Sequence, residues 1–189
     1  MIIFLTLAVL AVAFLYSSVG HAGASGYIAV MTLFSLAPTE IKPIALILNI
    51  LVASITSWQF WRSGHFSWSL FWPFALLAIP CAFMGGYLNL PTHLFKILVG
   101  FVLLASAVRF MVSNPIEQEP QKPSRSSSFI VGAGLGLLAG LTGTGGGIFL
   151  TPLLIFRRWA QTKTASAISA LFILVNSMAG LLGNWSATR

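Results

Sequence analysis

The sequence contains no aspartate and only three glutamates, Glu40, Glu117 and Glu119. Carboxylates act as general acids, general bases and ligands of hard metal ions, so their scarcity removes most candidates for those roles. The single cysteine, Cys81, and the three histidines form no cluster with metal-ligand spacing. These absences argue against an enzyme and against a bound metal or other cofactor.

Charged residues are scarce, at 7% of the 189 positions, whereas soluble domains carry about 25%. Hydrophobic residues make up 57%, and apolar runs of about 20 residues, long enough to cross a bilayer, separate the few charges. The net charge of +7 comes from Lys and Arg residues that mostly flank these runs, where they anchor spans beside lipid phosphates. The sequence predicts an all-α integral membrane protein that contacts the lipid bilayer and does not bind nucleic acid.

The N-terminus lacks the basic segment of a secretory signal, because no Lys or Arg precedes Lys42. We therefore expect the apolar stretch that begins at Ile2 to be a retained membrane span. Cys81 lies in an apolar run and has no partner for an intrachain disulfide. It is expected to pack as a small hydrophobic residue.

The expected fold is a polytopic helix bundle with about six membrane segments, which fall on either side of one hydrophilic stretch at 113–128. That stretch contains three prolines and three consecutive serines, which is typical of a solvent loop. It joins a first repeat of four segments, 1–112, to an incomplete second repeat of two segments, 129–189. The six segments are 2–36, 43–61, 68–88, 94–112, 129–156 and 164–182.

Two of these segments contain clusters of glycine. One reads Gly-Leu-Thr-Gly-Thr-Gly-Gly-Gly at 140–147, and a weaker copy, Gly-His-Ala-Gly-Ala-Ser-Gly, occupies 20–26, which is 120 positions earlier. Consecutive glycines permit an unwound or left-handed turn at membrane depth. Non-helical backbone there has to be buried in protein or line a wet cavity, because an unsatisfied amide in hydrocarbon costs several kcal/mol. Each cluster predicts a broken span.

The two clusters indicate a duplicated four-helix unit. Aligning Gly20 with Gly140 also aligns later glycines, and Asn49 falls on Asn176 once a gap of seven residues is allowed. If each of the four segments between the copies crosses the membrane once, the two units run in the same direction. Simple alternation of the spans also places five basic residues on each side, including Arg125 and Arg157 on opposite sides, which leaves the orientation open.

Broken spans suit an anion, because amide N–H groups and the positive end of a helix dipole face the break. Close helix packing without a ligand is the alternative reading of the glycines. We favour packing for the spaced glycines at 132, 136 and 140, and a binding site for the denser clusters. The candidate site residues are Gly20, His21, Gly23, Ser25, Gly26, Asn49, Thr142, Gly143, Thr144, Gly145, Gly146, Gly147 and Asn176.

Three of these polar residues have a structural alternative. Asn49 and Asn176 lie in the middle of apolar segments, where an amide needs a partner. They either line the site or form interhelical hydrogen bonds that contribute about 0.6 to 2 kcal/mol each. His21 either titrates and couples transport to protons, or serves as a structural hydrogen-bond donor.

The glycine-rich sequence at 140–148, Thr151-Pro152 and the run AISALFILVNSMAG at 167–180 closely resemble the TauE/SafE, or sulfite exporter, family of membrane permeases. The resemblance implies a multi-pass protein of the bacterial inner membrane, usually of eight spans in two related halves, that moves sulfite, sulfonates or related organosulfur anions. The first motif departs from the family pattern, with Tyr27 in place of its third glycine and unusual residues at His21 and Ala24. The matching positions of the second half are Gly143, Gly145, Gly146, Gly147, Pro152 and Asn176.

The sequence therefore predicts a secondary transporter that binds a small anion where the two broken segments meet and exposes it alternately to each side. The alternative is a non-transporting fragment or a membrane subunit that needs a partner, because the second repeat lacks two expected spans. A homo-oligomer or a partner chain would then supply those spans. An integral-membrane enzyme ranks last, because acid, base and metal roles have almost no candidate residues.

Overall fold

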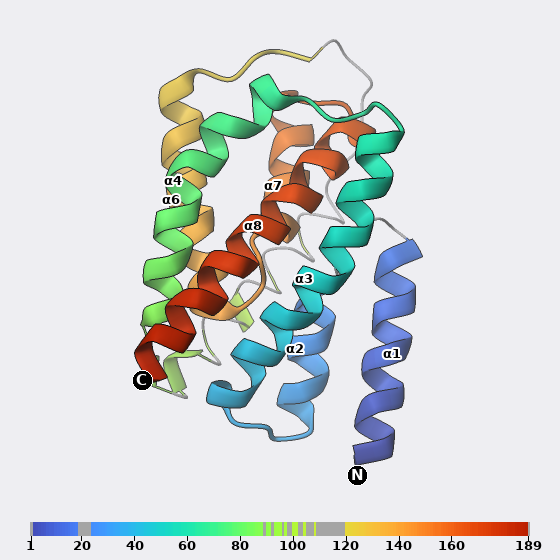
Figure 1. Ribbon diagram of the computed structural model, residues 1–189, viewed down its shortest axis with the longest axis vertical. Coiled ribbons are helices and arrows are strands. Elements are labelled where there is room, and N and C mark those ends of the chain that lie inside the picture. The colour runs from blue at the N-terminus through green and yellow to red at the C-terminus, as the bar shows by residue number, and fades with distance from the viewer. Residues whose placement is uncertain are drawn as a thin grey trace.

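The computed structural model describes residues 2–18, 24–88, 90, 91, 93–95, 97, 100, 101, 104, 108 and 120–188. Regular secondary structure in these ranges is helical, which confirms the predicted all-α class, and no strand occurs among them (Figure 1). The helices are α1 (Ile2–Ser18), α2 (Ala24–Leu33), α3 (Pro38–Arg62), α4 (Trp68–Tyr87), α6 (Arg125–Thr142), α7 (Gly147–Phe156) and α8 (Thr162–Thr188).

Three of the described helices, α3, α4 and α8, are long and apolar enough to cross a membrane. The outward face of α3 shows why a bilayer suits it, since Ile47, Leu51 and Ile55 are large, apolar and exposed. The predicted segments 43–61, 68–88 and 164–182 coincide with these three helices. Most of the predicted segment 94–112 lies outside the described residues, so the count of six spans stays a prediction.

The starts of two helices differ from the predicted segment limits because of local capping. Helix α3 begins before position 43, at Pro38, where the Glu40 carboxylate accepts a hydrogen bond from the Ala37 amide at 3.2 Å. Helix α6 begins at Arg125, inside the stretch expected to be loop up to 128, because the Ser124 hydroxyl accepts from the Ser127 amide at 3.2 Å. The division into two repeats joined by this stretch remains a prediction.

Glycines bring α6 and α4 into backbone contact. A β-carbon added at Gly132, Gly136 or Gly140 would collide with a carbonyl oxygen of α4, belonging to Phe74, Ala78 or Ala82 respectively. Small residues four apart allow such close approach between helices in a membrane. The prediction that these spaced glycines serve packing is confirmed.

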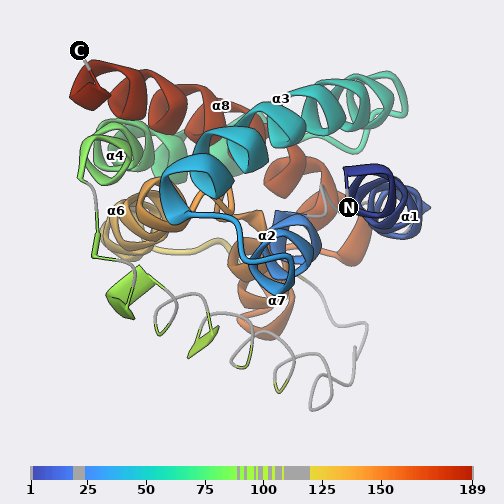
Figure 2. The same cartoon turned by 90° about the horizontal axis from the view of Figure 1, so that it is seen from below.

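Helix α7 packs in the interior of the bundle. Leu150 and Leu154 of α7 are fully buried in one core cluster with Phe74 of α4 and Phe172 of α8. Seen from below, α7 lies to one side of the row formed by α4, α8 and α3 (Figure 2), and it packs against α8. The N-terminal end of this short apolar helix is therefore buried in protein, whereas its C-terminal end, at Phe156, is exposed.

The segment 129–156 turns back on itself. Helix α6 starts at the end of the molecule where α3 leads into α4, and α7 returns to that same end (Figure 1). The amide of Gln121, before α6, donates to the carbonyl of Arg158, after α7, at 2.6 Å. Simple alternation of the spans, which would separate Arg125 from Arg157, therefore does not hold for this segment. Glycines with left-handed φ between the helices reverse the chain direction. We call residues 125–156 the α6–α7 hairpin.

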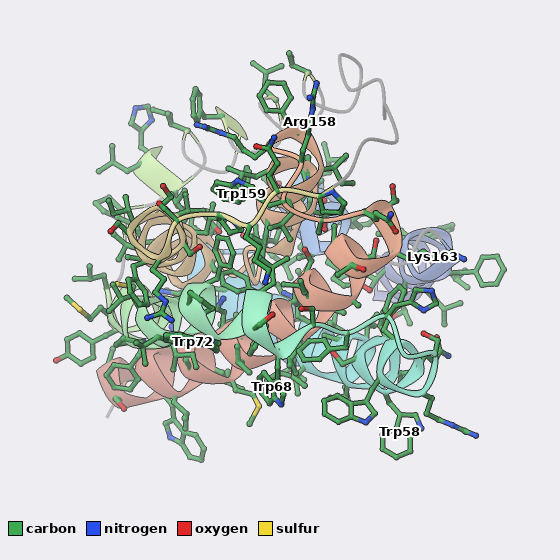
Figure 3. All side chains as sticks on the ribbon, turned by 90° about the horizontal axis from the view of Figure 1, so that it is seen from above. Trp58, Trp68, Trp72, Arg158, Trp159 and Lys163 are labelled. Atoms are coloured by element: carbon green, nitrogen blue, oxygen red, sulfur yellow. The ribbon has the colours of Figure 1, made fainter. Side chains whose placement is uncertain are left out.

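Basic residues gather at the end of the molecule where α6 begins and α7 ends. Of the seven described Lys and Arg residues, Lys42 alone lies near the opposite end of α3. Figure 3 looks onto the end that carries the other six, and Arg158, Lys163, Trp58, Trp68, Trp72 and Trp159 are spread across this view. We call this the basic end, and its members are Arg62, Lys122, Arg125, Arg157, Arg158 and Lys163.

The first glycine cluster is only partly described. Helix α2 starts at Ala24, so Ser25 and Gly26 are helical and do not belong to a break, contrary to expectation. Gly20, His21 and Gly23 lie outside the described residues, and the duplication stays a prediction.

Candidate functional site

The turn between α6 and α7, residues 143–146, is built from glycines with positive φ. Gly143 has φ +78°, Gly145 +71° and Gly146 +79°, a region that other L-residues rarely adopt. The Gly143 amide closes the end of α6 by donating to the Ala139 carbonyl at 2.9 Å. We call residues 143–146 the glycine turn. It is buried along with its flanking residues Thr142 and Gly147.

The hydroxyls of Thr142, just before the glycine turn, and Thr144, within it, form hydrogen bonds with groups close in sequence. The Thr142 hydroxyl donates to the Leu138 carbonyl at 2.6 Å, and the Thr142 and Thr144 hydroxyl oxygens are 2.9 Å apart. These bonds stabilise the end of α6 against unwinding. A direct role for either hydroxyl in holding a ligand stays a prediction.

Amide groups at the start of α7 remain available. Phe149 and Leu150 donate to the Gly146 carbonyl at 3.2 and 3.3 Å, while the amides of residues 145–148 make no backbone–backbone hydrogen bond within the described chain. Successive N–H groups around glycines in left-handed conformation, at the positive end of a helix dipole, form a concavity that suits an anion. The glycine turn has this geometry.

Helix α3 forms one wall of the site. The side-chain amide of Asn49 donates to the Gly143 carbonyl at 3.0 Å, and its Oδ1 has no hydrogen-bond partner in the described structure. Asn49 is completely buried. The structure thus joins a residue predicted from the apolar segment 43–61 to the glycine cluster predicted from 140–147.

Lys42 lies two helical turns before Asn49 on the same face of α3, and sequence reasoning missed it. A β-carbon at Gly143 would lie 3.4 Å from its Cα, so its backbone contacts the glycine turn. The Lys42 ammonium is buried and donates to the carbonyls of Gly85 at 3.0 Å, Gly86 at 2.7 Å and Leu88 at 2.9 Å. A cation there complements the negative end of the α4 dipole. The spacing of seven residues from Asn49 was the available signal.

Helix α8 forms the opposite wall. A β-carbon at Gly145 would lie 2.9 Å from the Ser177 hydroxyl oxygen and 3.4 Å from the Asn49 amide nitrogen, so both side chains reach the glycine turn. Asn176, the neighbour of Ser177, is also fully buried. Neither the Ser177 hydroxyl nor either polar atom of Asn176 has a hydrogen-bond partner among the described residues.

These unpaired polar atoms are unusual for a protein interior. Leaving a buried donor or acceptor without a partner costs about 1–3 kcal/mol. Asn49 Oδ1 and the Ser177 hydroxyl are two such atoms on side chains that reach the glycine turn, and the neighbouring Asn176 contributes two more on α8. A polar ligand that supplied their partners would recover that cost, so the cluster has the chemistry of a binding site.

The site lies at the middle depth of the bundle. Asn49 is close to the centre of the 25-residue α3, and Ser177 is close to the centre of the 27-residue α8. In transporters, substrate sites lie near the bilayer midplane, at interrupted helices. The described residues contain no group of three His, Cys, Asp or Glu side chains placed to hold a metal ion.

Comparisons with known proteins identify the family. The family model described as "Sulfite exporter TauE/SafE" matches residues 5–188. The chain is 38% identical over 192 residues to a probable membrane transporter protein of Sinorhizobium fredii, covering 97% of this chain and 77% of that protein. It is 28% identical over 127 residues to a probable membrane transporter protein of Methanocaldococcus jannaschii, covering 65% and 47% respectively. No solved structure matches. The chain belongs to the TauE/SafE family of membrane transporters.

Proposed function

We propose that this chain transports a small anion, namely sulfite, a sulfonate or a related organosulfur anion, across a bacterial cell membrane. The observation that carries this proposal is the buried glycine turn at mid-depth, which the side chains of Asn49 and Ser177 reach with unpaired polar atoms. The family description, which names sulfite export, supports the choice of substrate class.

The chemistry around the glycine turn favours an anion over a cation. Three features there attract or bind negative charge. They are the amide N–H groups of residues 145–148, the positive end of the α7 dipole and the Ser177 hydroxyl, which can donate a hydrogen bond. Lys42, whose backbone contacts Gly143, carries a buried ammonium that donates to the carbonyls at the end of α4. The one carboxylate in the described chain, Glu40, is exposed at the start of α3 and does not oppose these groups. Sulfite and sulfonate oxygens accept hydrogen bonds from such donors.

Transport by alternating access requires the site to open to each side in turn. In this proposal the buried glycine turn represents the occluded stage, because Thr142 to Gly147 are all buried. The first motif, including Gly20, His21 and Gly23, would contribute the facing half of the site. Its contribution stays a proposal, as does coupling to protons through His21.

Removing an unpaired polar group should separate a binding role from a structural one. We expect Ser177→Ala and Asn176→Leu to reduce sulfite or sulfonate flux into proteoliposomes at least tenfold while thermal stability is unchanged or raised. Deleting a buried group that has no partner removes its desolvation cost. Ser186→Ala on the same helix is the matched control, because the Ser186 hydroxyl is exposed and already donates to Leu182.

The opposite pattern would refute the proposed role. If Asn176→Leu lowers the melting temperature while flux per folded molecule stays at the wild-type value, the asparagine merely holds helices together. Unchanged flux in Ser177→Ala as well would remove the glycine turn as the substrate site.

Gly145→Ala gives a second test, with Gly64→Ala as its control. Both glycines have φ +71°, so alanine is strained by about 1–2 kcal/mol at either position. At Gly145 the new β-carbon would also lie 2.7 Å from Ile173 Cγ2, whereas at Gly64 nothing lies within 4 Å. We expect Gly145→Ala to abolish flux and Gly64→Ala to retain it, each normalised to folded protein. Equal flux in the two variants would contradict the proposed site.

A further inference from the structure

A cavity of about 590 Å³ opens at the basic end, away from the glycine turn. Its walls come from the start of α4, the residues leading into α6 and the loop before α8. Helix α6 separates it from the glycine turn by about 27 Å, at 1.5 Å for each of 18 residues. The cavity therefore does not belong to the proposed transport site.

The wall of this cavity combines positive charge with hydrogen-bonding side chains. Lys122 and Arg125 line it, and so do Gln121, Gln161 and Thr164. The Arg125 guanidinium carbon lies 5.9 Å from the centre of the Trp72 ring, which holds the charge at the rim. Such a wall matches a phosphate group, whose oxygens accept hydrogen bonds from guanidinium, ammonium and amide groups.

Among the residues that the structure describes, the charge at this end is of one sign. Six of the seven described Lys and Arg residues lie here, and the one described carboxylate, Glu40, lies at the other end of α3. Glu117 and Glu119 fall outside the described residues. Basic residues concentrate on the cytoplasmic side of membrane proteins, beside the anionic lipids of that leaflet.

Tryptophans place the cavity at the level of lipid headgroups. Trp58, Trp61 and Trp68 are exposed at 64%, 55% and 57% around the turn from α3 to α4, and Trp72 lines the cavity itself. Tryptophan rings are enriched at the boundary between the hydrocarbon and the polar headgroups. A lipid can therefore bind with its phosphate in the cavity and its acyl chains against the apolar side chains on the hydrocarbon side of the tryptophans.

We propose that this cavity binds the phosphate headgroup of an anionic phospholipid, and that the basic end accordingly faces the cytoplasmic leaflet. Lys122 and Arg125 hold the phosphate, and Trp72 packs against the glycerol region. The lipid would join the base of the α6–α7 hairpin to the start of α4, since both border the cavity.

Native mass spectrometry of the full chain in detergent tests this site. Phosphatidylglycerol is titrated against phosphatidylcholine and against inorganic phosphate. One tight phosphatidylglycerol is expected, and its affinity should fall about thirtyfold in the double variant Lys122→Gln/Arg125→Gln, since each basic residue near an anionic lipid contributes a factor of about five. Arg62→Gln/Lys163→Gln, which removes the same charge from the same end outside the cavity, should bind like wild type.

Three results would overturn the proposal. Equal losses in the two double variants would show that diffuse charge binds the lipid, and equal affinity for phosphatidylcholine would remove the need for an anionic headgroup. Inorganic phosphate binding as tightly as phosphatidylglycerol would identify a site for a soluble anion. Thermal melting of each variant checks that it is folded. All four substituted residues are exposed, so the substitutions should leave the fold intact.

Discussion

A Gly136→Val variant is expected to lose its folded state. The valine β-carbon would overlap the Ala78 carbonyl oxygen and lie 2.6 Å from the Ala78 Cα, so the obstacle is backbone, which cannot rotate away. Overpacking costs about 1–3 kcal/mol where side chains can yield, and more where they cannot. Size-exclusion chromatography and thermal unfolding in detergent should show aggregated protein without a cooperative transition.

Gly134→Val provides the control on the same helix. A β-carbon at Gly134 meets nothing within 4 Å, so this variant carries the same change in side-chain volume without the collision. It should elute and melt like wild type. A cooperative transition of wild-type stability in Gly136→Val would show that α4 and α6 do not pack through this glycine.

Lys42→Met is expected to destabilise the protein by about 3 kcal/mol or more, since three buried carbonyls lose their donor at about 1–3 kcal/mol each. Methionine keeps the volume of the side chain but cannot donate to Gly85, Gly86 or Leu88. The end of α4 would then separate from α3. Denaturant or thermal unfolding measures the loss, and flux assays on the remaining folded protein report on the glycine turn that Lys42 contacts.

Lys163→Met is the control for Lys42→Met. It removes one positive charge without removing the hydrogen bonds that Lys42 donates to α4. Lys163 is exposed in the first turn of α8, so its replacement should change stability by less than about 0.5 kcal/mol. Should Lys42→Met unfold at the same temperature as Lys163→Met, the bonds from Lys42 do not hold α4 in place.

Composition and hydropathy were sufficient to predict the helical membrane class and the positions of α4 and α8. The direction of the segment 129–156 could not be predicted in this way. Hydropathy measures how apolar a run is, and this run is long enough to cross. Whether it crosses or returns depends on the φ angles of Gly143, Gly145 and Gly146, which composition does not specify.

Site residues could be predicted from the sequence where a polar side chain stands within an apolar segment. Asn49 and Asn176 stand out in apolar segments, and the structure places both in its interior. Lys42 did not stand out, because a basic residue near the end of a span usually reaches toward the headgroups. Its burial depends on carbonyls 43 to 46 positions away, on a helix that meets α3 only in the folded chain.

The α6–α7 hairpin also has a consequence for biogenesis. Lys122 and Arg125 precede this apolar run and Arg157 and Arg158 follow it, so basic residues that resist translocation flank both sides. Because both flanks resist translocation, we expect the run to be inserted as a loop with its two ends on the same side. A topology derived by counting apolar runs would assign the end of α8 to the same compartment as Arg125. The structure places the end of α8 at the opposite end of the molecule from Arg125 (Figure 1).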